Sequence, residues 1–416
     1  MDKKNINLVT AIAVIGGFIF GLNMAGISGG VESIKDAFSL TDNGIGLVVS
    51  SLTIGCLLGA MFTGNFADRY GRKKVFLAIA LLFVISSVGC ALASNQWALM
   101  AFRLMAGLAV GADSVVGPMY ISEMAPAERR GKLVTYQQFL ITIGILVAYV
   151  IDYFLLDLSQ SWRYMLAVPA VFGVVFFILV LLLLPESERW EHNIAAGKSA
   201  NPAPRVKFGG LFKGRIGHVV LIGTALAALQ QITGINAVIN YAPTIFQQTG
   251  VGGGTALLQS CIVGVVNVLS TIVAIRLIDT KGRKTLLIGG AIGMIVSLFY
   301  LMLSFIFSWS PVGVLVALLV YIAFFGASFS PVMWVVNNEI FPDSVRAQAV
   351  SFATAVSWVC TFIVVQFSPS ILNSLGGAWL FGIFGVFSVI ALFFVIFRIP
   401  ETKGKTFEQI QKELGL

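Results

Sequence analysis

Long apolar runs separated by short polar connections dominate the pattern of this chain. A membrane-spanning helix needs about 20 mostly apolar residues, and twelve runs fit that length. They cover residues 8–27, 45–66, 75–93, 97–120, 133–154, 164–184, 219–246, 256–278, 286–307, 312–338, 347–371 and 379–397. A long polar interval, 185–218, divides them six and six. The pattern predicts an all-α integral membrane protein with twelve transmembrane helices, spans 1 to 12, in two six-helix bundles.

The polar interval sets the expected domain boundaries. We expect an N-terminal bundle at 1–184, a linker with at most short helices at 185–218, a C-terminal bundle at 219–398 and a tail at 399–416. Lysine and arginine gather in both tails and in the connections after even-numbered spans, whereas the opposite connections offer Lys35 and Arg163. By the positive-inside rule, both termini and the linker are cytoplasmic in a protein of the plasma (inner) membrane.

Composition excludes several other classes of protein. The 416 residues are 57% hydrophobic and 11% charged, against about 25% charged residues in soluble domains. The net charge of +8 does not indicate nucleic acid binding, because the basic residues are scattered through short loops. The four cysteines lie far apart in apolar runs without metal-ligand spacing, and the spans carry no nucleophile–base set. We therefore expect no enzyme, metal or cofactor.

Three polar motifs occur twice, once in each half. "GNFADRYGRKK" at 64–74 returns as "AIRLIDTKGRK" at 274–284, "EMAPAERRG" at 123–131 returns as "EIFPDSVRA" at 339–347, and "PESERW" at 185–190 returns as "PETKGK" at 400–405. The same order at nearly one offset indicates duplication of a six-helix unit. Because six is even, the copies are parallel, an arrangement typical of transporters with a midplane site between the halves.

These motifs resemble those of the sugar porter family of the major facilitator superfamily, which includes glucose and xylose transporters. The resemblance covers nearly the whole chain and is carried further by "RLMAGLAVGADSVVGPMYISEMAP" in span 4, "QQITGINA" in span 7 and "SPVMWVVNNEIFP" in span 10. It implies two pseudo-symmetric bundles of the major facilitator fold and transport of a hexose or pentose by alternating access. It also implies a lipid-embedded protein that functions as a monomer.

The segment "QQITGINAVIN" at 230–240 places two glutamines, a threonine and two asparagines inside an apolar span. Amides are costly in hydrocarbon unless they are paired, and a carboxamide can donate to and accept from sugar hydroxyls without a charge. Gly234 and Pro243 weaken the helix around the segment. The alternative is that these amides only hold helices together. The resemblance implies that span 7 is broken near this point and that its amides bind the sugar.

Residue by residue, the resemblance implies a substrate site that combines amides with two tryptophans able to stack on a sugar ring. Its members are Gln138, Gln230, Gln231, Asn236, Asn240, Asn267, Trp334 and Trp358. Asn240 stands where the family usually has tyrosine, and Ser330, Met333 and Ser357 also depart from the family pattern. The sugar therefore stays open, with a polyol such as inositol as an alternative. We expect Trp97, Trp162 and Trp379 to be interfacial anchors.

The duplicated charges form a predicted cytoplasmic gate. Isolated loop charges are usually solvated, but arginine can bind carboxylates bidentately and bridge helix ends, and the resemblance implies that such pairs close the cytoplasmic face. The gate residues are Asp68, Arg72, Glu123, Arg130, Glu186, Arg189, Asp279, Arg283, Glu339 and Arg346.

The energy source is predicted from span 1. Proton-coupled members of the family commonly carry an aspartate opposite an arginine of span 4, but this chain has Asn23 there and keeps Arg103. Because asparagine cannot carry a proton near neutral pH, the sequence favours a uniporter. The alternative is a proton symporter that uses Asp113, a costly carboxylate inside span 4, about 15 Å along the helix from Arg103. Asp113 can also be explained as a protonated group bonded to a neighbouring helix, or as one wetted by the cavity.

Overall fold

The computed structural model describes residues 3–125, 130–187, 190–192, 210–342, 345–405 and 407–414, and the regular elements in these ranges are helices. The chain forms two compact units, unit 1 (Met1–Ala203) and unit 2 (Pro204–Leu416). Residues 193–209 of the expected linker lie outside the described ranges. The exact domain boundaries stay a prediction.

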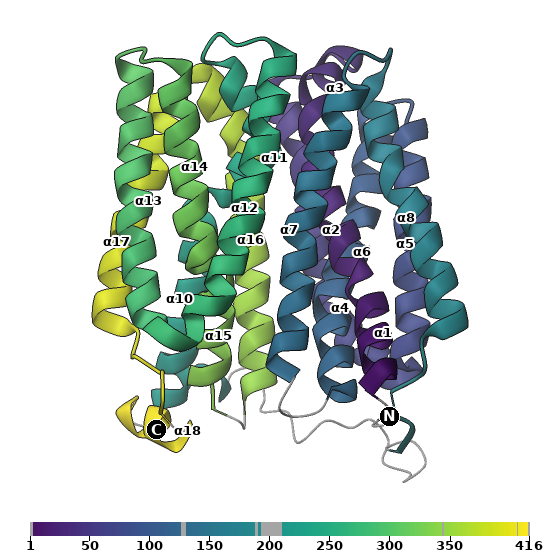
Figure 1. The fold of residues 1–416 in the computed structure, drawn as a ribbon, viewed down its shortest axis with the longest axis vertical. Coiled ribbons are helices and arrows are strands. Elements are labelled where there is room, and N and C mark those ends of the chain that lie inside the picture. The colour runs from purple at the N-terminus through teal and green to yellow at the C-terminus, as the bar shows by residue number, and fades with distance from the viewer. Residues whose placement is uncertain are drawn as a thin grey trace. The chain divides into compact units, whose positions relative to one another are not determined.

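In unit 1 the six spans pack as three pairs. α4 lies along α6, α5 along α8, and α2 along α7 (Figure 1). The helices are α1 (Lys3–Ala13), α2 (Ile15–Ala25), the 3-10 helix η1 (Ser28–Gly30), α3 (Val31–Ala37), α4 (Asp42–Tyr70), α5 (Arg72–Leu92), α6 (Gln96–Met124), α7 (Arg130–Leu155) and α8 (Ser161–Leu183).

Unit 2 repeats this pairing. α12 lies along α14, α13 along α17, and α10 along α16, so each span packs as its counterpart does in unit 1. The helices are α10 (Gly214–Ile232), α11 (Ile235–Gln247), α12 (Gly253–Lys281), α13 (Arg283–Ile306), α14 (Pro311–Ala327), α15 (Phe329–Ile340), α16 (Arg346–Ser374), α17 (Gly377–Arg398) and α18 (Phe407–Glu413). The shared packing confirms the duplication inferred from the motifs.

Twelve segments of the described ranges are long and apolar enough to cross a membrane, and they fall on the twelve predicted runs. The prediction for span 1 was too short at its end. The segment continues from residue 27 to Ala37, through η1 and α3, because the glycines and polar residues that end the apolar run still adopt helical conformations. Spans 7 and 10 each consist of two helices, α10 with α11 and α14 with α15.

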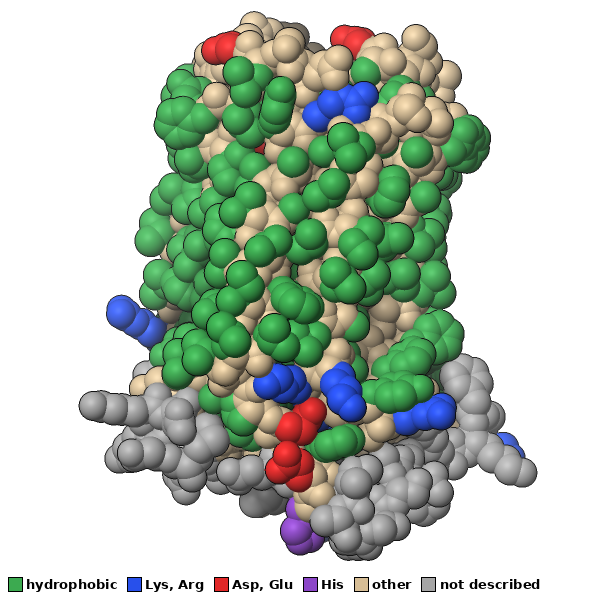
Figure 2. Space-filling model, turned by 90° about the vertical axis from the view of Figure 1, so that its right-hand side faces the viewer, with side chains coloured by type: hydrophobic (Ala, Val, Ile, Leu, Met, Phe, Trp, Pro, Cys, Tyr) green, Lys and Arg blue, Asp and Glu red, His purple; other side chains and the backbone are tan. Residues whose placement is uncertain are grey.

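The surface has the character expected of a membrane protein. The face seen in Figure 2 carries hydrophobic side chains across its middle and charged side chains mainly near its two ends. Trp97 and Trp379 are 66% and 62% exposed, as interfacial anchors require. The prediction was wrong for Trp162, which is buried and packs against the ring of Phe38.

Candidate functional site

Span 7 is broken within the amide-rich segment, as the sequence predicted. α10 ends at Ile232, α11 begins at Ile235, and Gly234 between them has a φ of +100°. A Cβ at this position would also overlap the ring of Phe384, so both the backbone and the space require glycine. A second irregularity follows at Tyr241, with a φ of −123° and a ψ of 17°, just before Pro243.

Four of the predicted substrate-binding amides form one connected chain around this break. Gln231 Nε2 donates to Gln230 Oε1 at 3.0 Å, and Asn236 Nδ2 donates to Gln231 Oε1 at 2.6 Å. Asn240 Nδ2 donates to the backbone oxygen of Asn236 at 2.8 Å. Gln230 and Asn240 are buried, whereas Gln231 and Asn236 are partly exposed. The two central amides therefore combine mutual support with access to a ligand.

The remaining predicted substrate residues lie on other helices. Asn267 is buried on α12, with its Oδ1 close to Gly326 of α14, and Trp334 and Trp358 are partly exposed on α15 and α16. Both tryptophan-bearing helices pack against α10, which carries two of the amides. Gln138 is partly exposed on α7 of unit 1.

The charged end of unit 1 contains a buried network centred on Arg72. Its guanidinium donates to both oxygens of Glu123, from Nε at 3.0 Å and from Nη2 at 2.9 Å, and Nη2 also reaches Asp68 at 3.0 Å. Its backbone N–H donates to Glu186 at 2.8 Å. The Ser187 hydroxyl donates to Glu123 at 2.6 Å. This bidentate pair lies out of solvent, with only 8% of the Arg72 side chain exposed, so it is not an ordinary solvated contact.

Unit 2 repeats the network with equivalent residues. Arg283 Nη2 donates to Glu339 at 3.0 Å, its backbone N–H donates to Glu401 at 2.9 Å, and the Thr402 hydroxyl donates to Glu339 at 2.5 Å. A glycine with positive φ precedes each arginine, and a Cβ on it would overlap the carboxylate that accepts from the backbone. Duplicated motifs thus fold into duplicated contacts.

Glu401 belongs to this network although the sequence prediction omitted it. Burial alone would raise the pKa of its carboxyl, but backbone N–H groups of Lys403, Arg283 and Lys284 donate to it and hold the pKa below its ordinary value of 4.5. The repeat of "PESERW" as "PETKGK" contained the necessary signal, because Glu401 is the counterpart of Glu186.

Of the other predicted gate residues, the structure describes the side chain of Arg346. Arg346 begins α16, and its Nε donates to the backbone oxygen of Phe341 at 3.3 Å. Arg189 lies outside the described residues, as do the side chains of Arg130 and Asp279.

The three coupling candidates are buried in unit 1. Arg103 Nη1 donates to the backbone oxygen of Asn23 at 2.9 Å, and Asn23 Nδ2 donates to Ile19 in its own helix. Arg103 thus lies opposite Asn23, at the position where proton-coupled members of the family carry an aspartate. Asp113 Oδ2 accepts from Gln137 Nε2 at 3.0 Å. Among the described residues, Asp113 Oδ1 and Gln137 Oε1 have no hydrogen-bond partner.

A second buried carboxylate in unit 1 escaped the sequence analysis. Asp152 of α7 is 1% exposed, and its Oδ2 accepts from the backbone N–H of Gly29 at 3.0 Å and from the Ser28 hydroxyl at 3.5 Å. It thus binds the turn η1 at which span 1 changes helix type. Asp152 lies near a polar connection, so the sequence alone did not reveal that it points into the bundle.

Comparisons with known proteins agree with this architecture. The family model described as "Sugar (and other) transporter" matches residues 9–414. The chain belongs to this transporter family. The glucose transporter GlcP of Staphylococcus epidermidis is 36% identical, with 99% of this chain and 98% of that protein aligned. The D-xylose-proton symporter of Escherichia coli is 34% identical, with 99% and 96% aligned. The inward-open structure of the xylose transporter XylE from E. coli matches with a TM-score of 0.86 and 32% identity, covering 98% of this chain and 99% of that one.

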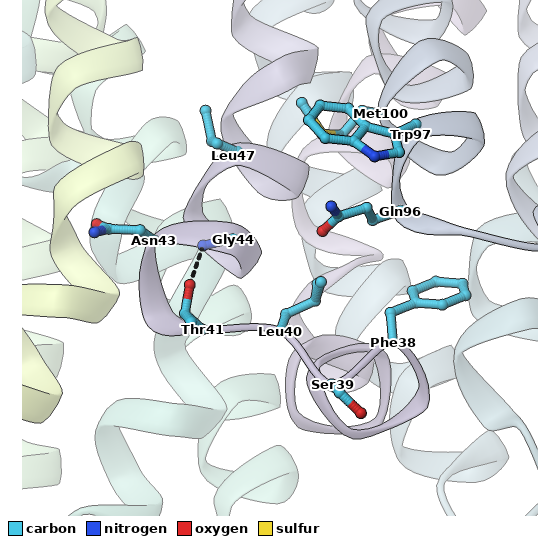
Figure 3. A pocket seen from close by; sticks show the side chains of 10 residues that line it. All are labelled: Phe38, Ser39, Leu40, Thr41, Asn43, Gly44, Leu47, Gln96, Trp97 and Met100. Atoms are coloured by element: carbon cyan, nitrogen blue, oxygen red, sulfur yellow. Dashed lines mark hydrogen bonds between the residues drawn. The ribbon is translucent and has the colours of Figure 1, made fainter.

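Two surface hollows of the transporter are not lined by any predicted substrate-binding, gate or coupling residue. One, of about 390 Å³ in unit 1, is lined by the α3–α4 connection and the starts of α4 and α6, including Leu40, Asn43 and Trp97 (Figure 3). The other, of about 530 Å³ in unit 2, is lined by apolar residues of α13 and α17, including Phe299 and Trp379. The hollow in unit 2 is apolar and includes an exposed tryptophan, which fits contact with lipid rather than with a sugar, whereas the hollow in unit 1 mixes apolar with polar side chains.

Proposed function

We propose that this transporter carries a monosaccharide across the membrane by facilitated uniport, with alternating access to a site formed around the amide chain. The observation that carries the proposal is the series of hydrogen-bonded amides. In this series Gln231 and Asn236 are held by neighbouring amides beside a helix break. The names of the glucose and xylose transporters at 34–36% identity support a hexose or pentose as the substrate.

The chemistry of the amides supports sugar over an ionic substrate. A carboxamide has two N–H donors and an oxygen with two acceptor positions, so the bonds within the chain leave donors and acceptors for sugar hydroxyls. The proposed site carries no fixed charge, which suits a neutral ligand. The contributions of Gln138, Asn267, Trp334 and Trp358 stay predictions of the resemblance.

Uniport follows from the residue at the usual coupling position. The Asn23 side chain donates to its own helix, and Arg103 donates to the backbone oxygens of Asn23 and Val49. Neither group changes its protonation near neutral pH. A bound sugar would then move down its own gradient without a proton.

Proton symport through Asp113 is the second candidate. It is favoured by the partnerless Asp113 Oδ1, which is buried against Gly16, where a Cβ would overlap the carboxylate. A protonated carboxyl is better tolerated in such a place than an ionised one. If Asp113→Asn abolished sugar accumulation but preserved sugar exchange, Asp113 would be the proton carrier.

We further propose that the transporter works as a monomer in the plasma membrane with both termini cytoplasmic, the orientation that places the Arg72 and Arg283 networks on the cytoplasmic side. In this proposal the units at 1–184 and 219–398 move as bodies. The duplicated arginine networks stabilise the state whose cytoplasmic end is closed.

Equilibrium binding to the purified protein tests the substrate assignment. Unlabelled hexoses, pentoses, inositol and organic acids are added in turn to protein that has bound labelled glucose or xylose, and the loss of bound label is measured. We expect displacement by a hexose or a pentose and none by organic acids. Displacement by inositol at lower concentrations than any hexose or pentose requires would replace the monosaccharide with a polyol, and displacement by organic acids would refute the neutral site.

A further inference from the structure

Unit 2 contains a second broken span whose break is tied to that of span 7. α14 ends at Ala327 and α15 begins at Phe329, with Ser328 between them at a φ of −133° and a ψ of −84°. Broken helices leave backbone groups without helical partners, which other side chains must satisfy inside a membrane. At the end of α10 the backbone oxygen of Thr233 accepts from span 10, and at the start of α15 the backbone oxygens of Phe329 and Ser330 accept from span 7.

The two spans exchange hydrogen bonds at their breaks. Tyr321 of α14 donates its hydroxyl to the backbone oxygen of Thr233, the last residue before Gly234, at 2.9 Å. In return, Gln230 of α10 donates Nε2 to the backbone oxygens of Phe329 at 2.8 Å and Ser330 at 3.4 Å. Tyr321 and Thr233 are fully buried, and Gln230 is 3% exposed. We call Gln230, Thr233, Tyr321 and Phe329 the clasp.

The clasp shares one residue with the proposed sugar site. Gln230 holds span 10 through its nitrogen and accepts from Gln231 through its oxygen. A ligand that rearranges the Gln231–Asn236 pair therefore changes the bond that supports Gln230. Tyr321 has no such link to the amides, and its hydroxyl reaches span 7 through a backbone oxygen only.

The break in span 10 packs closely against α13. A Cβ on Gly290 of α13 would overlap the Ser328 side chain, and one on Gly293 would overlap the Phe324 ring. The Ser328 hydroxyl donates to the backbone oxygen of Phe324 at 2.6 Å. The break therefore packs closely against α13 on one side and is bonded to span 7 through the clasp on the other.

We propose that Tyr321 is a positioning residue that couples occupancy of the sugar site to movement at both helix breaks. This role rests on the proposed sugar transport. Its hydroxyl binds the end of α10 to span 10. A shift of the Gln230 side chain on sugar binding then moves the two helix breaks together. Without the hydroxyl, sugar still binds to its amides, but the conformational step that follows is slowed.

The test compares Tyr321→Phe with Tyr120→Phe in full-length protein. Both changes remove one buried hydroxyl that donates to a backbone oxygen, Thr233 at 2.9 Å for Tyr321 and Pro185 at 2.7 Å for Tyr120, and both keep the ring. Tyr120 lies in unit 1, in the continuous stretch of α6. Sugar affinity at equilibrium and the maximal rate of transport into proteoliposomes are measured on the same samples, with glucose and xylose as probes.

We expect Tyr321→Phe to lower the maximal rate about fivefold, as loss of one hydrogen bond in the moving state allows, with affinity within about twofold of wild type. Tyr120→Phe should keep sugar affinity near wild type and lower thermal stability about as much as Tyr321→Phe, so that a stability loss alone is not mistaken for the positioning role. An unchanged rate in Tyr321→Phe, or a loss of affinity as large as the loss of rate, would overturn the positioning role. Failure of the wild-type protein to bind either sugar would instead refute the proposed function.

Discussion

At the scale of single residues, the amide chain distinguishes ligand contact from helix adhesion. Gln231 and Asn236 are partly exposed, so truncating either one should remove bonds to sugar without leaving a buried hole. We predict that Gln231→Ala and Asn236→Ala each weaken sugar binding by about 1–3 kcal/mol, while the protein still folds.

Isothermal titration and size-exclusion chromatography of the purified variants check this prediction. Asn338→Ala is the matched control, because the Asn338 amide is exposed and donates within α15. Normal sugar affinity in both cavity variants, combined with collapsed expression, would show that the amides only hold helices together.

Glu401 gives a prediction about pH. Its pKa is lower in the folded protein than the ordinary value of 4.5, so its contribution to stability is present above that value and is lost as the pH falls through the folded pKa. Wild-type protein should therefore lose thermal stability as the pH falls below 4.5, and Glu401→Gln should lose less over the same fall.

Thermal unfolding in detergent across these pH values measures the difference. Glu413→Gln is the control, because Glu413 forms a more exposed pair with Lys405. Equal pH dependence in wild type and Glu401→Gln would contradict the role given to the backbone donors.

Residues also show how far the sequence could predict this site. Gln230 and Asp113 stood out because a polar group inside an apolar run is costly and visible. Asp152 and Tyr321 did not stand out. Asp152 lies near a polar connection, where a carboxylate is expected, and the aromatic ring of Tyr321 is common in apolar spans. What they bind depends on which backbone groups are freed at breaks in other helices, and no local pattern encodes this.

At the scale of elements, the break in span 7 depends on Gly234. Its φ of +100° and the nearby Phe384 ring combine backbone strain with steric overlap. Gly250 has a φ of +85° but open space around its Cβ position. Replacing it with alanine therefore introduces backbone strain without steric overlap, at a cost of roughly 1 kcal/mol. We predict that Gly234→Ala destabilises the protein more than Gly250→Ala and slows sugar transport.

Thermal unfolding and initial uptake rates of the two variants provide the comparison. Equal effects of the two substitutions would mean that the break is not held by the contact with Phe384. The family resemblance implied this break, with Gly234 and Pro243 as support, whereas no break was predicted in span 10 although Gly326 and Pro331 lie on either side of Ser328.

The charged element ends lead to a further prediction. Because Arg72 bonds both oxygens of Glu123 in a buried pair, lysine cannot reproduce its geometry. Arg72→Lys should lower thermal stability clearly, whereas Arg69→Ala, at an exposed position one turn earlier, should change it little. Similar melting temperatures for both variants would identify the Arg72 network as a set of solvated charges.

At the scale of the whole molecule, two copies of one unit use the same pairs of helices and the same arginine networks. Sequence repeats predicted this duplication because motif spacing survives even where other residues have diverged. The units differ inside their bundles. Unit 1 buries Asp113 and Asp152, whereas unit 2 carries the amide chain and the clasp. This asymmetry is consistent with a substrate held mainly by unit 2.

The central claim is facilitated transport of a monosaccharide. Uptake of labelled hexoses and pentoses into proteoliposomes, with and without an inward proton gradient, tests it most directly. We predict that at least one sugar enters until its concentrations inside and outside are equal, and that the proton gradient leaves this final level unchanged. Entry of none of the sugars, or accumulation above the external concentration when the gradient is imposed, would contradict the account.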